Sequence, residues 1–185
     1  MLSNLEAALE FSARMSTPHP LRANKAEPSP REDLKEFDLS EGFLIVAENV
    51  SLNGLAIGNL IVGNPLKPDL HSALSELNGP TGRACIPDGM VCIGSWEANA
   101  LAVNSAHPGH SADDVYAIEL WRGPEARPQT LAPNLSMLLT AAANHWQLVR
   151  GDSEDWRDMS QRLDQLGGFS TAMRRQWRAL WESGC

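Results

Sequence analysis

The sequence has little of what marks a secreted or membrane-spanning chain. Its 185 residues include three cysteines, an odd number without metal-site spacing, so reduced thiols are expected. No run of about 18 apolar residues occurs, which argues against a membrane-spanning helix. The first residues lack the basic start and apolar stretch of a secretory signal. We therefore predict a cytoplasmic protein that does not contact a membrane.

Positive charge is also scarce. The chain has 15 Lys and Arg against 23 Asp and Glu, a net charge of −8. Nearly all of the excess lies in residues 27–120, which hold fourteen acidic and four basic residues. A surface of this sign repels nucleic acid and attracts a basic partner. An acidic face that serves only solubility is the alternative interpretation.

The motifs of common catalytic sites are missing. The sequence has no Gly-x-Ser-x-Gly elbow, no glycine-rich phosphate loop and no P-loop lysine. Cys92 lies in an apolar stretch, which predicts a buried thiol rather than a nucleophile paired with His145. A metal-dependent hydrolase using His107, His110 and Asp114 is an alternative hypothesis. Because this cluster falls in a turn between two expected strands, we predict no enzyme, metal or cofactor.

Hydrophobic periodicity predicts helices near both ends of the chain and strands between them. Helices are expected at 2–15, 30–37, 66–78, 134–146, 152–166 and 170–181. Strands are expected at 43–46, 55–62, 90–93, 98–103 and 115–120, with Asn53-Gly54 joining the first two as a hairpin. This order predicts an α+β domain over 1–150, with a mostly antiparallel sheet flanked by helices. An extra C-terminal helical pair over 151–185 is expected to pack on it.

Six tryptophans stand beside a single tyrosine. Four of them lie on the apolar stripes of expected helices and are predicted to be core: Trp146, Trp156, Trp177 and Trp181. Tryptophan and arginine also dominate many protein interfaces, and arginines flank the last two. A structural or regulatory adaptor that forms a homodimer through helices 152–183 is therefore a further alternative.

The segment 86–146 carries an ordered set of short motifs. An expected strand ends in Ile93-Gly94, a second strand follows at 98–103, and a third begins Asp114-Val115-Tyr116. A helix entry then reads Leu131-Ala132-Pro133-Asn134-Leu135. In this order the motifs resemble the core of the SUKH superfamily, which is named for a yeast cell-wall-synthesis regulator. The family's N-terminal helix ends in an Asn-Gly-Gly-like turn, which 30–37 and Asn53-Gly54 echo only loosely.

This resemblance implies a fold, a function and a kind of partner. Bacterial members are similar to immunity proteins that neutralise secreted toxins by direct binding, so a non-enzymatic protein-binding domain is implied. A cationic toxin domain would suit the acidity of residues 27–120. On this interpretation the partner surface consists of acidic groups around an apolar anchor, namely Glu97, Asp113, Asp114, Glu119 and Trp96.

Overall fold

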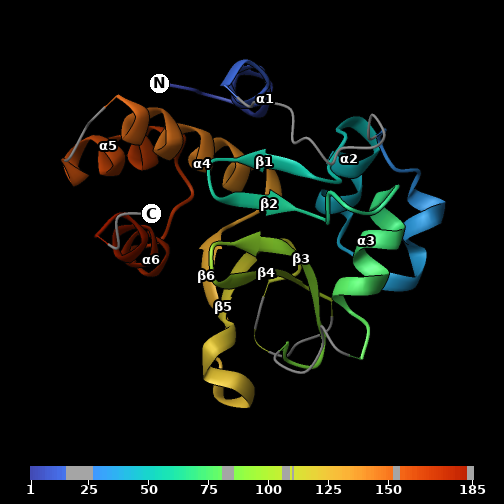
Figure 1. The fold of residues 1–185 in the computed structure, drawn as a ribbon. Coiled ribbons are helices and arrows are strands. Elements are labelled where there is room, and N and C mark those ends of the chain that lie inside the picture. The colour runs from blue at the N-terminus through green and yellow to red at the C-terminus, as the bar shows by residue number, and fades with distance from the viewer. Residues whose placement is uncertain (16–26, 81–85, 106–108, 110, 152–154, 183–185) are drawn as a thin grey trace.

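The protein is an α+β fold built on one antiparallel sheet (Figure 1). The structure is a computed structural model that describes residues 1–15, 27–80, 86–105, 109, 111–151 and 155–182. Six strands follow one another in sequence order across the sheet, and each pairs antiparallel with the next. They are β1 (Leu55–Ile57), β2 (Leu60–Val62), β3 (Met90–Trp96), β4 (Asn99–Asn104), β5 (Val115–Glu119) and β6 (Gln129–Ala132).

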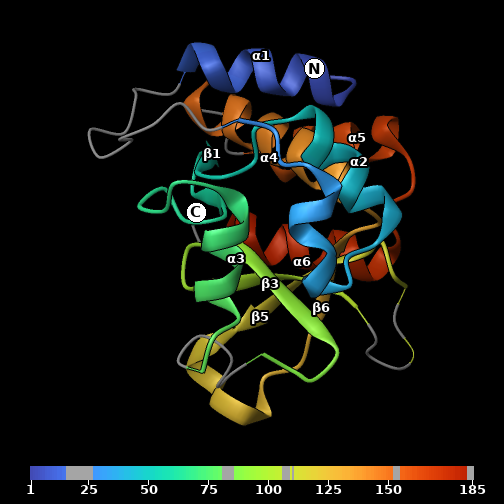
Figure 2. The ribbon, with the colours of Figure 1, turned by 90° about the vertical axis from the view of Figure 1, so that its right-hand side faces the viewer.

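Helices gather on two sides of this sheet (Figures 1 and 2). On one side lie the N-terminal helix α1 (Leu5–Met15) and the long helix α4 (Leu135–Arg150), with α5 (Trp156–Leu166) and α6 (Thr171–Glu182) beside them. The 3-10 helix η1 (Arg31–Phe37), α2 (Glu41–Asn49) and α3 (Leu70–Leu77) form another side. A second 3-10 segment, η3 (Leu120–Glu125), extends from the end of β5.

Both faces of the central strands are buried, as the sequence predicts for 115–120. The larger core includes Val91, Ile93 and Trp96 of β3, together with residues from the helices. Met90 and Cys92 of the same strand belong to a smaller cluster with Tyr116. The register of β3 against β4 shifts between Cys92 and Gly94, where a bulge changes the alternation of side chains. This shift explains how Trp96 lies on the same side as Ile93, three residues earlier.

The predicted strand at 43–46 is wrong, because these residues lie in α2. The Ser40 side chain accepts a hydrogen bond from the Phe43 N–H and caps the helix. Phe43, Val46 and Ala47 are then buried at helical spacing. An apolar run of four residues fits a strand or a helix equally well, so the flanking cap decides between them.

The predicted hairpin is also displaced. β1 and β2 form a hairpin within the single strand expected at 55–62, and Ile57 pairs with Leu60 across the turn. Gly58 occupies this turn with φ of 59°, and a Cβ there would lie 2.8 Å from the Trp146 ring. Glycine therefore meets both the backbone and the steric requirement of the turn. Asn53 instead joins the segment before β1 to the segment after β2, because its side chain donates to the Lys67 carbonyl and accepts from the Asn64 N–H.

Helix α4 organises the larger core. Asn134 caps it as predicted, accepting a hydrogen bond from the Met137 N–H. Asn144, which is fully buried, hydrogen-bonds both the N–H and the carbonyl of Leu2, at 3.0 and 2.8 Å. Arg162 of α5 donates to the same side-chain oxygen at 3.0 Å. One amide thus connects the segment before α1 with α4 and α5.

The C-terminal helices share the core of the preceding residues. Trp177 of α6 is fully buried, and its Nε1 donates to the Leu131 carbonyl of β6 at 2.9 Å. The other three tryptophans predicted as core, Trp146, Trp156 and Trp181, are partly buried against the same cluster. The apolar stripe of α6 therefore faces its own chain. Within the described residues, no helix is long and apolar enough to cross a bilayer.

Candidate protein-binding surface

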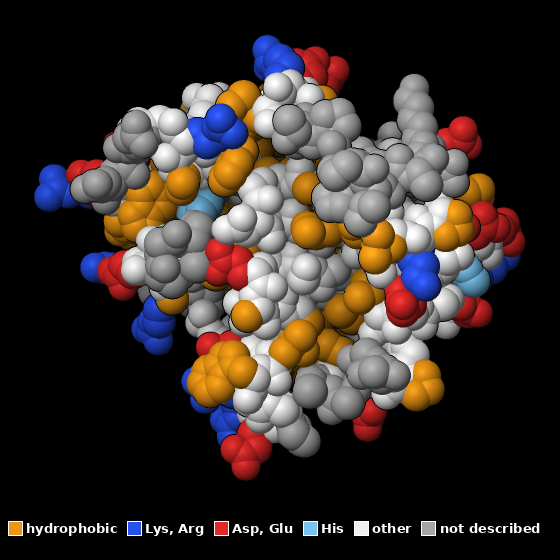
Figure 3. Space-filling model, viewed as in Figure 1, with side chains coloured by type: hydrophobic (Ala, Val, Ile, Leu, Met, Phe, Trp, Pro, Cys, Tyr) orange, Lys and Arg blue, Asp and Glu red, His pale blue; other side chains and the backbone are white. Residues whose placement is uncertain are grey.

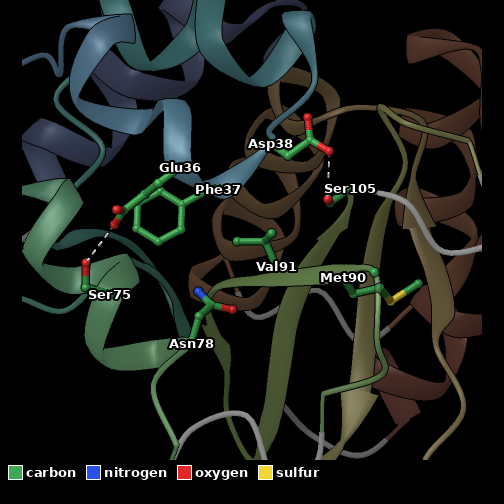
Figure 4. Close-up of a pocket in the computed structure, with 9 residues that line it drawn as sticks. Glu36, Phe37, Asp38, Ser75, Asn78, Met90, Val91 and Ser105 are labelled. Atoms are coloured by element: carbon green, nitrogen blue, oxygen red, sulfur yellow. Dashed lines mark hydrogen bonds between the residues drawn. The ribbon is translucent and has the colours of Figure 1, made fainter.

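A cleft of about 380 Å³ opens between η1, α3 and the paired ends of β3 and β4 (Figure 4). Two carboxylates from η1 and its C-cap stand at its sides, those of Glu36 and Asp38. Val91 and Phe37 supply apolar surface, whereas Asn78 supplies a polar one. We call this recess the acidic cleft; its lining is Glu36, Phe37, Asp38, Ser75, Asn78, Gly89, Met90, Val91 and Ser105.

Hydroxyl groups hold both carboxylates of the cleft in place. The Ser75 hydroxyl donates to Glu36 at 3.4 Å, and the Ser105 hydroxyl donates to Asp38 at 3.3 Å (Figure 4). Asp38 adopts the left-handed conformation, with φ of 50°, as the residue that ends η1. Aspartate is among the few residues that tolerate this conformation. The local backbone therefore fixes where the second carboxylate projects.

Helix α3 is fastened to the sheet beside the cleft. The Asn78 side chain, at the C-terminal cap of α3, accepts from the Cys92 N–H at 2.8 Å and donates to the Cys92 carbonyl at 2.9 Å. At the other end, Asp69 caps the helix by accepting from the Ser72 N–H. That hydrogen bond lowers the pKa of Asp69 below its ordinary value, so the carboxylate stays charged. Asn78 thus anchors the end of α3 that lines the cleft, whereas Asp69 lies at the far end of the helix beside another recess.

Acidic side chains continue outward from the cleft over η1 and α3, on the right of Figure 3. Residues 31–38 contain four acids and two bases, and both bases already have partners. Lys35 pairs with Glu32, while Arg31 pairs with Glu41 and Glu48 of α2. His71 lies 3.0 Å from Glu36, beside a second recess of about 490 Å³. Among the described ion pairs, none involves Asp33 or Asp38.

Trp96 is expected to be the apolar anchor of the partner surface, but the structure buries its side chain. Only 2% of Trp96 is exposed, and its ring lies 5.0 Å from Trp177 and 5.8 Å from His145, centroid to centroid. The bulge in β3 turns this side chain toward the helices. Alternation along a strand predicts which face a tryptophan occupies only if the strand is regular. A β-bulge, which the sequence does not reveal, moves the side chain to the opposite face.

The four predicted acidic groups lie at opposite ends of the sheet. Glu97 follows β3 and Glu119 ends β5, and Asn99 pairs with Trp96 on one side and with Glu119 on the other. Asp113 and Asp114 precede β5. Five residues of strand span about 17 Å, so the two pairs do not form one patch. Glu97 accepts a hydrogen bond from Asn59, Glu119 pairs with Arg122, and Asp114 accepts one from the Tyr116 hydroxyl.

The alternative metal site cannot be assembled from what the structure describes. His107 and His110 lie outside the described residues. Among the residues that are described, no group of three or more His, Cys, Asp or Glu has a metal-binding arrangement. Cys92 is buried, and burial raises the pKa of its thiol. It belongs to the smaller cluster, whereas His145 packs against Trp96 of the larger one, so the two do not form a nucleophile pair.

The sequence interpretation missed the acidic cleft. Its two carboxylates come from the charged run 31–38, for which the sequence pattern predicts only a short helix over 30–37. The available signal was the spacing of Glu36 and Asp38 around half-buried Phe37. Ser75, Asn78 and Ser105 meet this run only through the fold. Comparison with protein-family models, with curated proteins and with solved structures finds no match for the chain.

Proposed function

We propose that the protein is a non-enzymatic binding protein that neutralises a basic protein partner, most specifically a cationic bacterial toxin domain, by covering it with the acidic face of η1 and α3. The observation that carries this proposal is the acidic cleft. Two oriented carboxylates, Glu36 and Asp38, border a recess beside the half-buried ring of Phe37. A guanidinium or ammonium group has the matching charge, and its alkyl stem suits Phe37.

The electrostatics of the whole chain support the same partner. Residues 27–120 carry a net charge of −10, fourteen acidic against four basic residues, and the acidic cleft lies within them. A field of this sign raises the association rate with a cationic surface and mimics the phosphates that such a surface would bind. The resemblance to SUKH immunity proteins points to a toxin as the basic partner.

The homodimeric adaptor is less well supported, because Met173 and Trp177 on the stripe of α6 are buried in their own chain. Helix α2 ends at Asn49 and its cap residue Val50 is extended, so the resemblance rests on the motifs of residues 86–146 and not on this helix.

Co-expression with the products of the neighbouring genes tests the proposal. We expect one basic product to co-purify, with an association rate that falls steeply as salt is raised. Glu36→Gln and Asp38→Asn together should weaken binding about tenfold, since two charge pairs at exposed carboxylates contribute up to about 1 kcal/mol each. Glu6→Gln and Glu10→Asn on α1 form the control pair.

Two results would contradict the proposal. One is the absence of a complex with any neighbouring product. The other is a complex whose affinity the cleft pair and the control pair change equally, because the acidic cleft would then lie outside the interface.

A further inference from the structure

A third recess lies between α1, α2 and the start of α4, with a volume of about 540 Å³. We call it the α2 groove. Its size is within the range of pockets that bind small ligands or single side chains, roughly 300–1,000 Å³. In contrast to the acidic cleft, most of its lining is apolar. The apolar side chains are Leu5, Ile45, Val46, Val50 and Met137, and the polar contributions come from Asn49, Asp113, Asn134 and Ser136.

Ile45 gives this groove an exposed apolar wall. Half of its surface is exposed, although Val46, the next residue of α2, is only 8% exposed. Isoleucine at a helix surface gains free energy from any apolar group that covers it. The groove therefore favours an occupant with an aliphatic side chain.

Asp113 places one fixed negative charge at the rim. Its Oδ1 lies so close to α2 that a Cβ on Gly42 would come within 2.7 Å of it. Gly42 is in the first turn of α2, and the positive end of the helix dipole favours a charged carboxylate there. Asp113 is exposed, and none of the ion pairs among the described residues involves it. A cation from outside the chain fits this position.

The α2 groove adjoins the acidic cleft through the start of α2. Asp38 lines the cleft and Gly42 lines the groove. Gly42 comes four positions after Asp38, so their Cα atoms are at most about 14 Å apart. Figure 2 shows η1, α2 and α1 in succession along this side of the molecule. A protein that covers one recess is close enough to reach the other.

We infer that the α2 groove binds a segment of the same basic partner in which an aliphatic side chain neighbours a lysine or arginine. The aliphatic group packs on Ile45 and Val46 inside the groove, and the cation pairs with Asp113 at its rim. This inference rests on the proposed function for the identity of the partner. The chemistry of the groove itself can be tested without that partner.

The test uses the isotope-labelled full chain and three short probes: acetyl-Leu-Arg-amide, acetyl-Leu-Glu-amide and acetyl-Ser-Arg-amide. Amide chemical shifts are followed up to about 10 mM, because two side chains give millimolar affinity at best. We expect acetyl-Leu-Arg-amide to shift the amides of Ile45, Val46 and Asn49 in a saturable way. The other two probes should bind at least several-fold more weakly, since each lacks one of the two contacts.

Matched variants locate the binding. Asp113→Asn should weaken acetyl-Leu-Arg-amide about threefold to fivefold, the effect of one exposed charge pair, whereas Asp33→Asn on η1 should not. Ile45→Ser should abolish saturation, while Leu66→Ser, at an exposed leucine outside the groove, should leave it unchanged. The amide spectrum of each variant also reports that it is folded.

Three outcomes would overturn the inference: no saturable shift in α2, equal binding of the three probes, or shifts of the same amides with protein concentration alone. The last would mean that a second copy of the chain fills the groove. Because no toxin takes part, a negative result here leaves the acidic cleft standing. Conversely, the probe could bind the groove in a saturable way while no product of the neighbouring genes forms a complex. That result would contradict the proposed function and would still support the chemistry inferred for the groove.

Discussion

His145 makes the stability of the fold sensitive to mild acid. Its ring is 4% exposed and lies 5.8, 6.1 and 5.4 Å from the rings of Trp96, Trp177 and Trp181. Its Nε2 has no hydrogen-bond partner among the described residues. Burial lowers the pKa of His145 from 6.5 to about 4, although the nearby charge of Glu97 acts in the opposite direction.

The sign of the pH effect follows from this lowered pKa. The unfolded chain takes up a proton near pH 6.5, whereas the folded chain keeps His145 neutral until about pH 4. Between these values the unfolded state binds more protons, so acid favours unfolding. The full contribution is present above pH 6.5 and is lost as the pH falls through 4. Linkage gives a loss of about 1.4 kcal/mol by pH 5.5 and about 2.5 kcal/mol by pH 4.5.

Denaturant unfolding between pH 7.5 and 4.5 measures this loss in the free energy of unfolding. The wild type is compared with His145→Gln, which cannot titrate, and with His71→Gln, which removes an exposed imidazole on α3. The difference between wild type and His145→Gln should shrink by the amounts given above as the pH falls, because only the wild type loses this contribution. NMR titration of the imidazole gives the pKa directly. Parallel pH profiles, or a measured pKa near 6.5, would refute the reasoning.

Three further substitutions test the packing, with the free energy of unfolding as the readout. Trp177→Phe should cost about 2 kcal/mol, since it leaves the buried Leu131 carbonyl without its donor; a loss below about 0.5 kcal/mol would show that the bond contributes little. Asn134→Ala should cost about 1 kcal/mol through the lost cap, and Asn134→Ser should recover most of it. Gly42→Ala should destabilise because its Cβ meets the Asp113 carboxylate, yet in an Asp113→Ala background it should stabilise by about 0.5–1 kcal/mol. Stabilisation by Gly42→Ala in both backgrounds would mean that Asp113 moves aside freely.

Much of the fold could be predicted from local pattern. The strands predicted at 90–93, 98–103 and 115–120 correspond to β3, β4 and β5, although β3 extends three residues further, to Trp96. The cap at Asn134 follows from helix-start chemistry. The errors arose where local signals are degenerate: the four apolar residues 43–46 fit two structures, and the short strand 129–132 was not recognised at all. The secondary structure of both segments depends on tertiary contacts that the local sequence does not specify.

The candidate site was less predictable than the fold because long-range contacts build it. Glu36 is separated from Ser75 by 39 residues, and Asp38 from Ser105 by 67. No spacing in the sequence indicates that these pairs meet. The prediction for Trp96 failed for a local reason, because a single bulge in its own strand decides which face of the sheet the side chain occupies. Composition correctly located the acidity between 27 and 120 but not the face on which it concentrates.

The amide of Asn144 also sets an order of events during synthesis. Leu2 can dock only after Asn144 has left the ribosome and α4 has formed, although the strands between them pair with sequence neighbours and can assemble as they emerge. At about 5–20 residues per second, the segment before α1 waits roughly ten seconds or more for this partner. During that interval the apolar side of α1 is uncovered, and a nascent-chain chaperone has access to it.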